Sequence, residues 1–231
     1  SFRLADVFRL DKGIGRDYFR SGAPVILSNA SWGIAMAIQT AILGHLGKTA
    51  VTANSIATTV FQILTVLSYG AASASAVLIG KTVGEGKLDK VRQYAKTMQL
   101  LFLLLGLATG AALFLCRDFV LSFYAITPES RSLALAFIAV LSVTVVGTSY
   151  QMAVLTGIVR GGGDTRFVLF NDLIFMWGVV LPSSALAAFV FHLPPLMVFI
   201  CLKSDQILKW AVAAVKVNRG GWIRQLTRPA E

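Results

Sequence analysis

The chain has 231 residues, a formal net charge of +10 and a hydrophobic content of 56%, and charged residues make up only 14%. This charged fraction is well below the roughly 25% of an average soluble domain, and the mean hydropathy is +0.72. These values argue against a soluble helical core and predict an integral membrane protein.

Six segments reach the length of roughly 20 apolar residues that an α-helix needs to cross a bilayer. They are Ser21–Gly44, Thr49–Gly80, Thr97–Cys116, Ser132–Val159, Phe167–Phe191 and Leu193–Val217. The last is the weakest, because Lys203, Asp205 and Lys209 interrupt it. The runs are continuous rather than alternating, so we expect helices and not a transmembrane β-barrel. The predicted fold is an all-α membrane protein, a bundle of six transmembrane helices.

In this six-span topology, the basic residues are distributed unevenly between the two sides of the membrane. Of the 21 lysines and arginines, 18 fall on one side, and only Lys48, Arg117 and Arg131 fall on the other. Cytoplasmic loops carry an excess of Lys and Arg, so both termini and the two basic loops are predicted to be cytoplasmic. The basic excess therefore reflects topology, and no nucleic-acid partner is expected.

Three regions follow from this pattern. Residues 1–20 alternate apolar and charged side chains, which suits an amphipathic cytoplasmic lead-in helix at the level of the lipid headgroups. Residues 21–217 form the six-helix membrane region, and residues 218–231 form a basic cytoplasmic tail. No secretory signal peptide is recognised at the start of the chain.

Polar side chains are concentrated in the first two spans, whereas the third span has almost none. Hydrocarbon cannot satisfy such groups, so they are expected to face protein or a wet cavity. Hydrogen bonding between helices is the alternative to a substrate cavity. Aromatic rings could also present a face to a cation, although ordinary packing is equally compatible with them. The candidates for the cavity are Asn29, Trp32, Gln39, Asn54, Gln62 and Tyr150.

Residues 80–96, GKTVGEGKLDKVRQYAK, contain a GKT sequence. A phosphate-binding loop requires a glycine five residues before the glycine of GK and a preceding strand. Position 75 is serine, and a membrane helix precedes the segment. We therefore reject nucleotide binding and expect a glycine-rich exit from the second span, followed by an amphipathic entry into the third.

The stretch RGGGDTR at 160–166 separates the fourth and fifth spans. Glycine permits the positive φ found at helix C-termini, and Asp164 or Thr165 could cap the next helix. Arg160 could neutralise the carbonyl end of the helix that it terminates. Arg160, Gly161, Gly163 and Asp164 are thus predicted to form a structural turn, with no catalytic role.

Ionisable residues within the last two spans are the remaining candidates. Asp172 lies roughly 9 Å along its helix from Arg166, and Lys209 lies roughly 12 Å from Val217, so the two could reach similar depth. Asp205 precedes Lys209 by four residues, the favourable order for a helical ion pair. Asp172, Asp205 and Lys209 form either a structural ion-pair cluster or part of an ion-coupling site.

An enzyme is not expected, because no His, Cys or carboxylate cluster suggests a catalytic or metal site. No cofactor is predicted. The two cysteines, Cys116 and Cys201, indicate neither a disulfide nor a metal site.

Several motifs in order resemble the multidrug and toxic compound extrusion (MATE) family. RGGGDTR, followed by Asn171, Trp177 and Pro182, is similar to the RGxGDT segment of that family. The sequences SGAPVILSN with LGKTAVTANSIA, LIGKTVGEGKLDKVRQYAK, and LKSDQILKW with VKVNRGGWIRQLTR resemble other family segments in the same order.

The resemblance implies the C-terminal lobe of a transporter whose members have twelve helices in two six-helix lobes. The missing N-terminal lobe or a second six-helix chain would then be a partner, together with membrane lipid. The implied activity is secondary-active efflux of small cationic drugs or metabolites across a bacterial-type inner membrane, in exchange for H⁺ or Na⁺. The alternative is a lipid-linked polysaccharide flippase of the same superfamily.

One departure from the family concerns the coupling ion. In one branch, a glutamate in the first helix of this lobe belongs to the cation site. Residues 21–44 contain no acidic side chain here, and Gln39 is the nearest polar substitute. The resemblance therefore favours H⁺ over Na⁺ as the coupling ion.

Overall fold

The computed structural model describes residues 12–223, and every element of secondary structure within them is helical. In chain order, the elements are α1 (Lys12–His45), α2 (Lys48–Gly84), α3 (Leu88–Leu121), α4 (Pro128–Gln151), η2 (Met152–Val159), α5 (Thr165–Leu173), η3 (Ile174–Val180), α6 (Leu181–Ala185), η4 (Leu186–Val190), α7 (Pro195–Lys203) and α8 (Asp205–Asn218). The elements labelled η are π-helical turns that continue their α-helical neighbours.

Five helices of the described chain are long and apolar enough to cross a membrane, and they correspond to the first five predicted spans. Their bounds are Gly22–His45, Lys48–Gly84, Leu88–Leu121, Pro128–Val159 and Thr165–Val190. The structure thus confirms the helical membrane character of the fold.

The sixth predicted span, Leu193–Val217, is not one continuous helix. It is divided at Ser204 into α7 and α8, each too short to cross a bilayer alone. The hydroxyl of Ser204 donates a hydrogen bond to the carbonyl oxygen of Cys201 at 2.8 Å. The break coincides with the charged residues Lys203 and Asp205, which had weakened this span in the sequence.

The start of the chain differs from the expected division at residue 20. Helix α1 begins at Lys12, so residues 12–20 run without interruption into the first span, and Pro24 lies inside that helix. The rest of the predicted lead-in, residues 1–11, lies outside the described residues. The same is true of residues 224–231 of the predicted tail.

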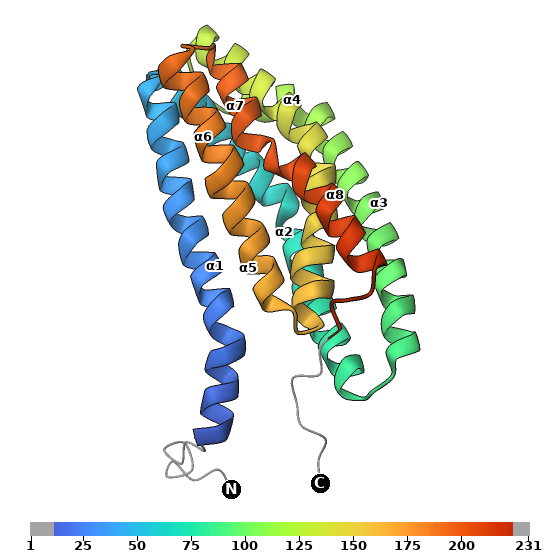
Figure 1. Ribbon diagram of the computed structural model, residues 1–231. Helices are drawn as coiled ribbons and strands as arrows, with labels where there is room; N and C mark the ends of the chain where they lie inside the picture. The colour runs from blue at the N-terminus through green and yellow to red at the C-terminus, as the bar shows by residue number, and fades with distance from the viewer. Residues whose placement is uncertain (1–11, 224–231) are drawn as a thin grey trace, which may run out of the picture.

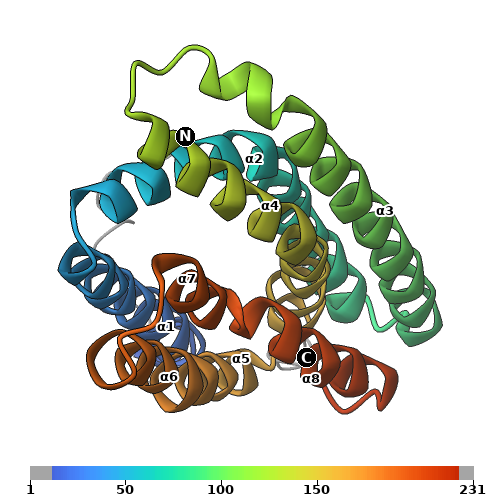
Figure 2. The ribbon, with the colours of Figure 1, turned by 90° about the horizontal axis from the view of Figure 1, so that it is seen from above.

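The helices are long rods arranged around a common centre. Figure 1 shows that the start of α1, the α2–α3 turn and the α4–α5 turn lie at the same lower end of the molecule. Viewed along the rods, α1, α2, α4, the α7–α8 pair and the α5–α6 segment surround the centre, and α3 lies outside α2 and α4 (Figure 2). The peripheral position of α3 agrees with its apolar sequence.

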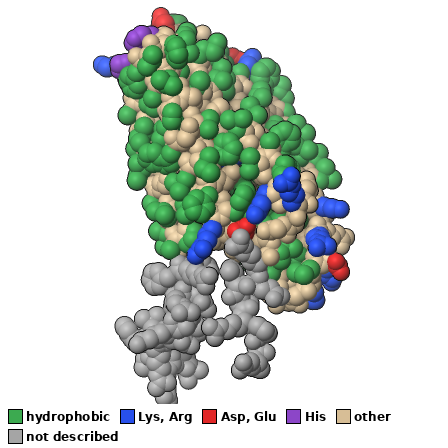
Figure 3. Space-filling view, viewed as in Figure 1, with side chains coloured by type: hydrophobic (Ala, Val, Ile, Leu, Met, Phe, Trp, Pro, Cys, Tyr) green, Lys and Arg blue, Asp and Glu red, His purple; other side chains and the backbone are tan. Residues whose placement is uncertain are grey.

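Close backbone contact attaches α3 to α4. A Cβ atom added at Gly106 would come within 2.9 Å of the Cα atom of Val146, and one at Gly110 would collide with the carbonyl oxygen of Ser142. Small residues permit such approach between membrane helices. The outer face of α3 carries exposed leucines such as Leu104 and Leu115. Hydrophobic side chains likewise cover most of the face seen in Figure 3.

Candidate functional site

A cavity of about 430 Å³ lies among α1, α2, α4–η2, α5–η3 and α7–α8. Volumes of roughly 300–1,000 Å³ are typical of pockets that hold small molecules. Hydroxyl and amide groups line the cavity together with apolar side chains, and five charged residues reach its wall. The polar and aromatic lining includes Ser28, Asn29, Trp32, Gln39, Thr58, Gln62, Tyr69, Ser73, Thr148, Gln151, Thr156 and Gln206.

Four of the six candidates for the cavity meet at this wall: Asn29, Trp32, Gln39 and Gln62. Asn54 lines an adjoining pocket of about 290 Å³, which shares Gln39 and Lys203 with the larger cavity. This pattern agrees with the expectation that the polar faces of the first two spans face a common space.

Tyr150 is the exception, and its placement corrects the prediction. It does not line either pocket; its hydroxyl donates to Oε1 of Gln99 on α3 at 2.6 Å. Its ring packs edge-on against Trp210 of α8, with centroids 5.8 Å apart. Position along the helix did not indicate the direction in which the side chain points.

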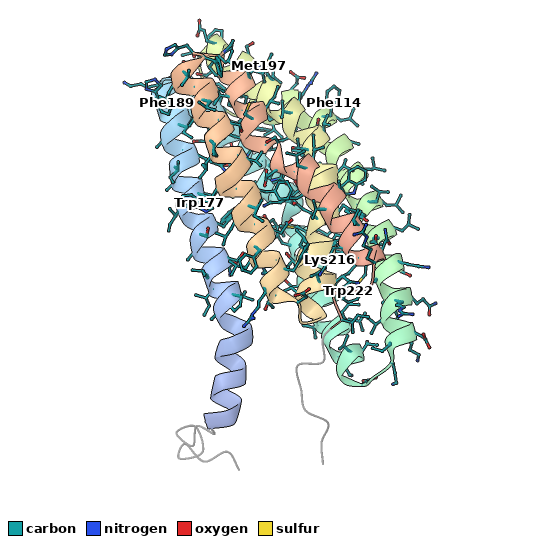
Figure 4. The ribbon with its side chains drawn as sticks, in the orientation of Figure 1. Phe114, Trp177, Phe189, Met197, Lys216 and Trp222 are labelled. Atoms are coloured by element: carbon teal, nitrogen blue, oxygen red, sulfur yellow. The ribbon has the colours of Figure 1, made fainter. Side chains whose placement is uncertain are left out.

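Polar contacts between α1 and the α5–η3 segment fix one side of the cavity. The indole Nε1 of Trp177 donates to the hydroxyl of Ser31 at 2.8 Å, and Figure 4 shows Trp177 beside α1. Gln39 and Met176, which both line the cavity, are also in contact, with Nε2 of Gln39 3.3 Å from Sδ of Met176. These contacts place the polar face of α1 against the segment that carries Asp172.

Asp172, Asp205 and Lys209 form a single cluster at the cavity wall. The Lys209 Nζ lies 3.2 Å from Oδ1 of Asp172 and 3.4 Å from Oδ2 of Asp205. The hydroxyl of Ser28 donates to the other oxygen of Asp172 at 2.8 Å. The Lys209 and Asp205 side chains are 6% exposed, whereas Asp172 is 31% exposed. Lys209 is therefore buried between two carboxylates, of which Asp172 is the more accessible.

Two further basic residues, Arg160 and Lys203, reach the same cavity. Burial lowers the pKa of the Arg160 guanidinium from its ordinary value, while the negative charge of nearby Asp172 opposes that shift. The charged lining thus consists of Arg160, Lys203 and Lys209 against Asp172 and Asp205.

An amide network that the sequence did not single out connects α4 to α8. Oε1 of Gln206 accepts from Nε2 of Gln151 at 2.6 Å and from the hydroxyl of Thr148 at 2.5 Å. Gly147 allows this approach, because a Cβ atom there would collide with the carbonyl oxygen of Gln206. In the sequence, the small residue at 147 and the polar residues near it were the features that could have indicated this contact between α4 and α8.

The RGGGDTR turn packs against the segment that follows α8. Gly163 has φ of +94°, a left-handed conformation that favours glycine. A Cβ atom at Gly161 would lie 2.7 Å from the carbonyl oxygen of Ala76 on α2. The buried Trp222 covers Gly162 and donates to the carbonyl of Val217 at 3.0 Å. The predicted structural role of the turn therefore has a direct basis in packing.

Asp164 occupies the N-cap position of α5, but no side-chain capping hydrogen bond forms there. Its carboxylate instead lies 2.9 Å from the Nζ of Lys216 on α8. Of the two residues that could cap α5, Asp164 thus forms a tertiary ion pair that attaches α8 to the α4–α5 turn.

Comparison with known proteins settles the family. The family description MatE matches residues 24–186, which is more than half of the chain. The chain belongs to the MATE family. Membership agrees with the apolar helices of the structure and makes it an integral, multi-pass membrane protein of a transporter family.

Curated relatives include the probable multidrug resistance protein NorM of Xanthomonas axonopodis pv. citri. It is 28% identical over 170 residues, which are 73% of this chain and 37% of that protein. The multidrug resistance protein MdtK of Yersinia pseudotuberculosis is 24% identical over 176 residues, 76% of this chain and 38% of that protein. The matched region is thus well under half of these MATE relatives.

Solved structures share the fold. A MOP superfamily transporter of Pyrococcus furiosus, whose binding pocket is described as having reverse polarity, superposes with a TM-score of 0.81 at 15% identity. An outward-facing multidrug resistance MATE transporter of the same superfamily gives the same values. In each case the alignment covers 90% of this chain and 46% of the solved chain.

Proposed function

We propose that the chain is the C-terminal six-helix lobe of a secondary-active efflux transporter, which exchanges organic cations, drugs or metabolites for H⁺ across a bacterial-type inner membrane. The observation that carries this proposal is the cavity of about 430 Å³, whose wall joins amide, hydroxyl and aromatic groups to an accessible carboxylate. The NorM and MdtK relatives, which are named for multidrug resistance, support the same activity.

The binding step follows from the composition of the wall. Trp32 lines the cavity, is 53% exposed and supplies an aromatic ring of the kind that binds cations. Gln62 and Asn29 supply hydrogen-bonding groups that fix the orientation of a bound molecule. Transport then requires a second lobe, or a second six-helix chain, against which this lobe rocks around the central site.

The coupling step is assigned to Asp172. Lys209 contacts two carboxylates, so Asp205, one helical turn away on the same helix, still neutralises it when Asp172 takes up a proton. Protonation of Asp172 would remove the negative charge that attracts a cationic substrate, and its deprotonation would restore it. Competition for one carboxylate in this way couples proton entry to cation exit.

A second candidate function is supported by the charges of the cavity. Three basic side chains and two acidic ones line it, and an excess of positive charge suits an anionic substrate. A flippase for lipid-linked polysaccharides, whose phosphate groups are anionic, is therefore the alternative to cation efflux.

Transport in proteoliposomes by the full-length protein, meaning this chain together with its partner lobe, distinguishes the two. We expect an imposed proton gradient to drive ethidium uphill, and a Na⁺ gradient alone to drive none. Trp32→Ala should reduce the initial rate several-fold. Trp210→Ala is the matched control, because Trp210 is 45% exposed and does not line the cavity.

Movement of a fluorescent lipid-linked glycan without movement of ethidium would favour the flippase and overturn the efflux proposal. If Trp32→Ala and Trp210→Ala reduced the initial rate of ethidium transport equally, the cavity would not be part of the substrate pathway.

A further inference from the structure

A second pocket lies outside the central cavity, on the surface formed by α8 and the first turn of α5. Its volume is about 520 Å³, and its wall includes Phe167, Val212 and Val215. Lys216 and Arg219 close one end of it. The wall is thus apolar along its length and basic at a single end.

The charged side chains at that end favour the binding of an anion. Lys216 lies between the carboxylate of Asp164, at 2.9 Å, and the ring of Phe167, whose centroid is 4.3 Å away. Arg219 is exposed, and among the described residues no carboxylate pairs with it. Arg166, also exposed, lies in the first turn of α5 at the same end of the bundle. Positive charge therefore exceeds negative charge around this end of the pocket.

The basic end of the pocket lies at the end of the bundle that the distribution of basic residues predicts to be cytoplasmic, where lipid headgroups are expected. Lys216 and Arg219 lie at the C-terminal end of α8, close to the α4–α5 turn. Figure 4 shows Lys216 above Trp222 at this end of α8, and Figure 3 shows basic side chains there, next to the hydrophobic body of the molecule. Val215 and Val212 continue from the basic end toward the middle of the membrane region.

We propose that this pocket binds an anionic glycerophospholipid. The phosphate lies between Lys216 and Arg219, and one acyl chain occupies the apolar surface of Val212, Val215 and Phe167. Basic pockets between helices on the cytoplasmic side are a general mode of anionic lipid recognition. The lipid would hold α8 against the α4–α5 turn from outside the bundle. The site is separate from the central cavity and does not depend on the transported substrate.

Native mass spectrometry of the purified full-length protein tests the proposal. We expect dioleoylphosphatidylglycerol to bind at least fivefold more tightly than dioleoylphosphatidylcholine. Arg219→Gln should weaken phosphatidylglycerol binding about fivefold, the size expected for one basic side chain near an anionic headgroup. It should leave phosphatidylcholine binding unchanged.

Two further variants separate a built site from general surface attraction. Arg92→Gln removes the same charge from an exposed position on the first turns of α3 and should have no effect. Val215→Trp fills the pocket at a half-exposed position and should reduce the number of tightly bound phosphatidylglycerol molecules by one.

Equal losses of phosphatidylglycerol affinity in Arg219→Gln and Arg92→Gln would overturn the proposal. So would unchanged lipid binding in Val215→Trp, or full displacement of the lipid by millimolar inorganic phosphate, because the acyl chain would then contribute nothing.

Discussion

At the residue scale, the three charged side chains at the cavity wall have unequal surroundings. Asp205 and Lys209 are both buried and lie on one helix, while Asp172 comes from the opposite helix and is the accessible member. Loss of Asp172 leaves Lys209 paired with the buried Asp205, whereas loss of Asp205 leaves it only Asp172, whose attraction is weakened by its partial exposure to solvent. The two carboxylates should therefore differ in what their loss does to the protein.

Asp172→Asn should abolish proton-driven efflux and leave the apparent melting temperature in detergent nearly unchanged, because Lys209 retains Asp205. Asp205→Asn should lower the melting temperature by a few degrees, because Lys209 then keeps only the more exposed Asp172 as its partner. Efflux and thermal unfolding are measured on the same full-length preparations. Asp89→Asn, an exposed carboxylate at the start of α3, is the control and should change neither.

A different result would assign Asp172 a structural role. In that case Asp172→Asn would destabilise the protein as much as Asp205→Asn, and adding Lys209→Met would restore the melting temperature. Wild-type efflux in Asp172→Asn at every proton gradient would remove Asp172 from the coupling step.

At the element scale, the irregular parts of the helices are concentrated at the cavity. The π-helical segment η2 contributes Met152, Leu155 and Thr156 to the wall, and η3 contributes Met176. The break between α7 and α8 contributes Lys203 and Asp205. π-helical turns are frequent at functional sites, and interrupted helices form the binding sites of many transporters. The π-helical segments η2 and η3 and the α7–α8 break thus line the cavity together with the regular helices α1 and α2.

The contact between α4 and α8 depends on Gly147. Gly147→Ala should lower the apparent melting temperature by the equivalent of about 1–3 kcal/mol, because its Cβ would meet the Gln206 carbonyl and force the helices apart. Gly70→Ala is the matched control, since nothing lies within 4 Å of a Cβ atom at that helical position. It should be neutral or slightly stabilising. Equal melting temperatures for the two variants would contradict the close approach of α4 and α8.

At the scale of the whole molecule, the unequal distribution of basic residues predicts the orientation in the membrane. Lys48 begins α2 and Lys87 precedes α3, and both are exposed. The α1–α2 and α2–α3 turns next to them lie at opposite ends of the bundle (Figure 1). The positive-inside rule places Lys87 in the cytoplasm and Lys48 outside.

Single cysteines at 48 and 87, in a protein whose Cys116 and Cys201 are serine, should react with an impermeant maleimide from opposite sides of the membrane. Intact cells should label position 48 only, and inverted vesicles position 87 only. Labelling of both positions from one side would refute the predicted topology.

The cavity also has consequences for transport by this chain alone. The chain aligns with 46% of the solved transporter chains, and a central site between two lobes cannot be closed by one of them. We expect the 231-residue chain, reconstituted by itself, to show no ethidium transport. Chemical crosslinking should accompany the assay, because a homodimer could replace the second lobe. Transport by a chain that crosslinking shows to be monomeric would contradict the half-transporter proposal.

The sequence by itself determined the membrane character, the first five spans and the position of the RGGGDTR turn. The reason is physical: backbone polar groups in hydrocarbon must be satisfied within the helix, so long apolar runs have few alternatives. The polar content of the first two spans also predicted a common polar face, and Asn29, Trp32, Gln39 and Gln62 do share one cavity.

Only the tertiary structure decided which side chains meet. The orientation of its helix about its own axis points Tyr150 toward Gln99 and not into the cavity. Asp164 pairs with Lys216 and makes no capping hydrogen bond to α5. Ser28 as a partner of Asp172, and the break at Ser204, likewise depend on contacts between helices distant in sequence. Helical periodicity is set by local hydrogen bonds, whereas facing direction and pairing are set by packing against neighbours. For that reason, hydropathy located the helices, and only the assembled bundle showed which charges meet.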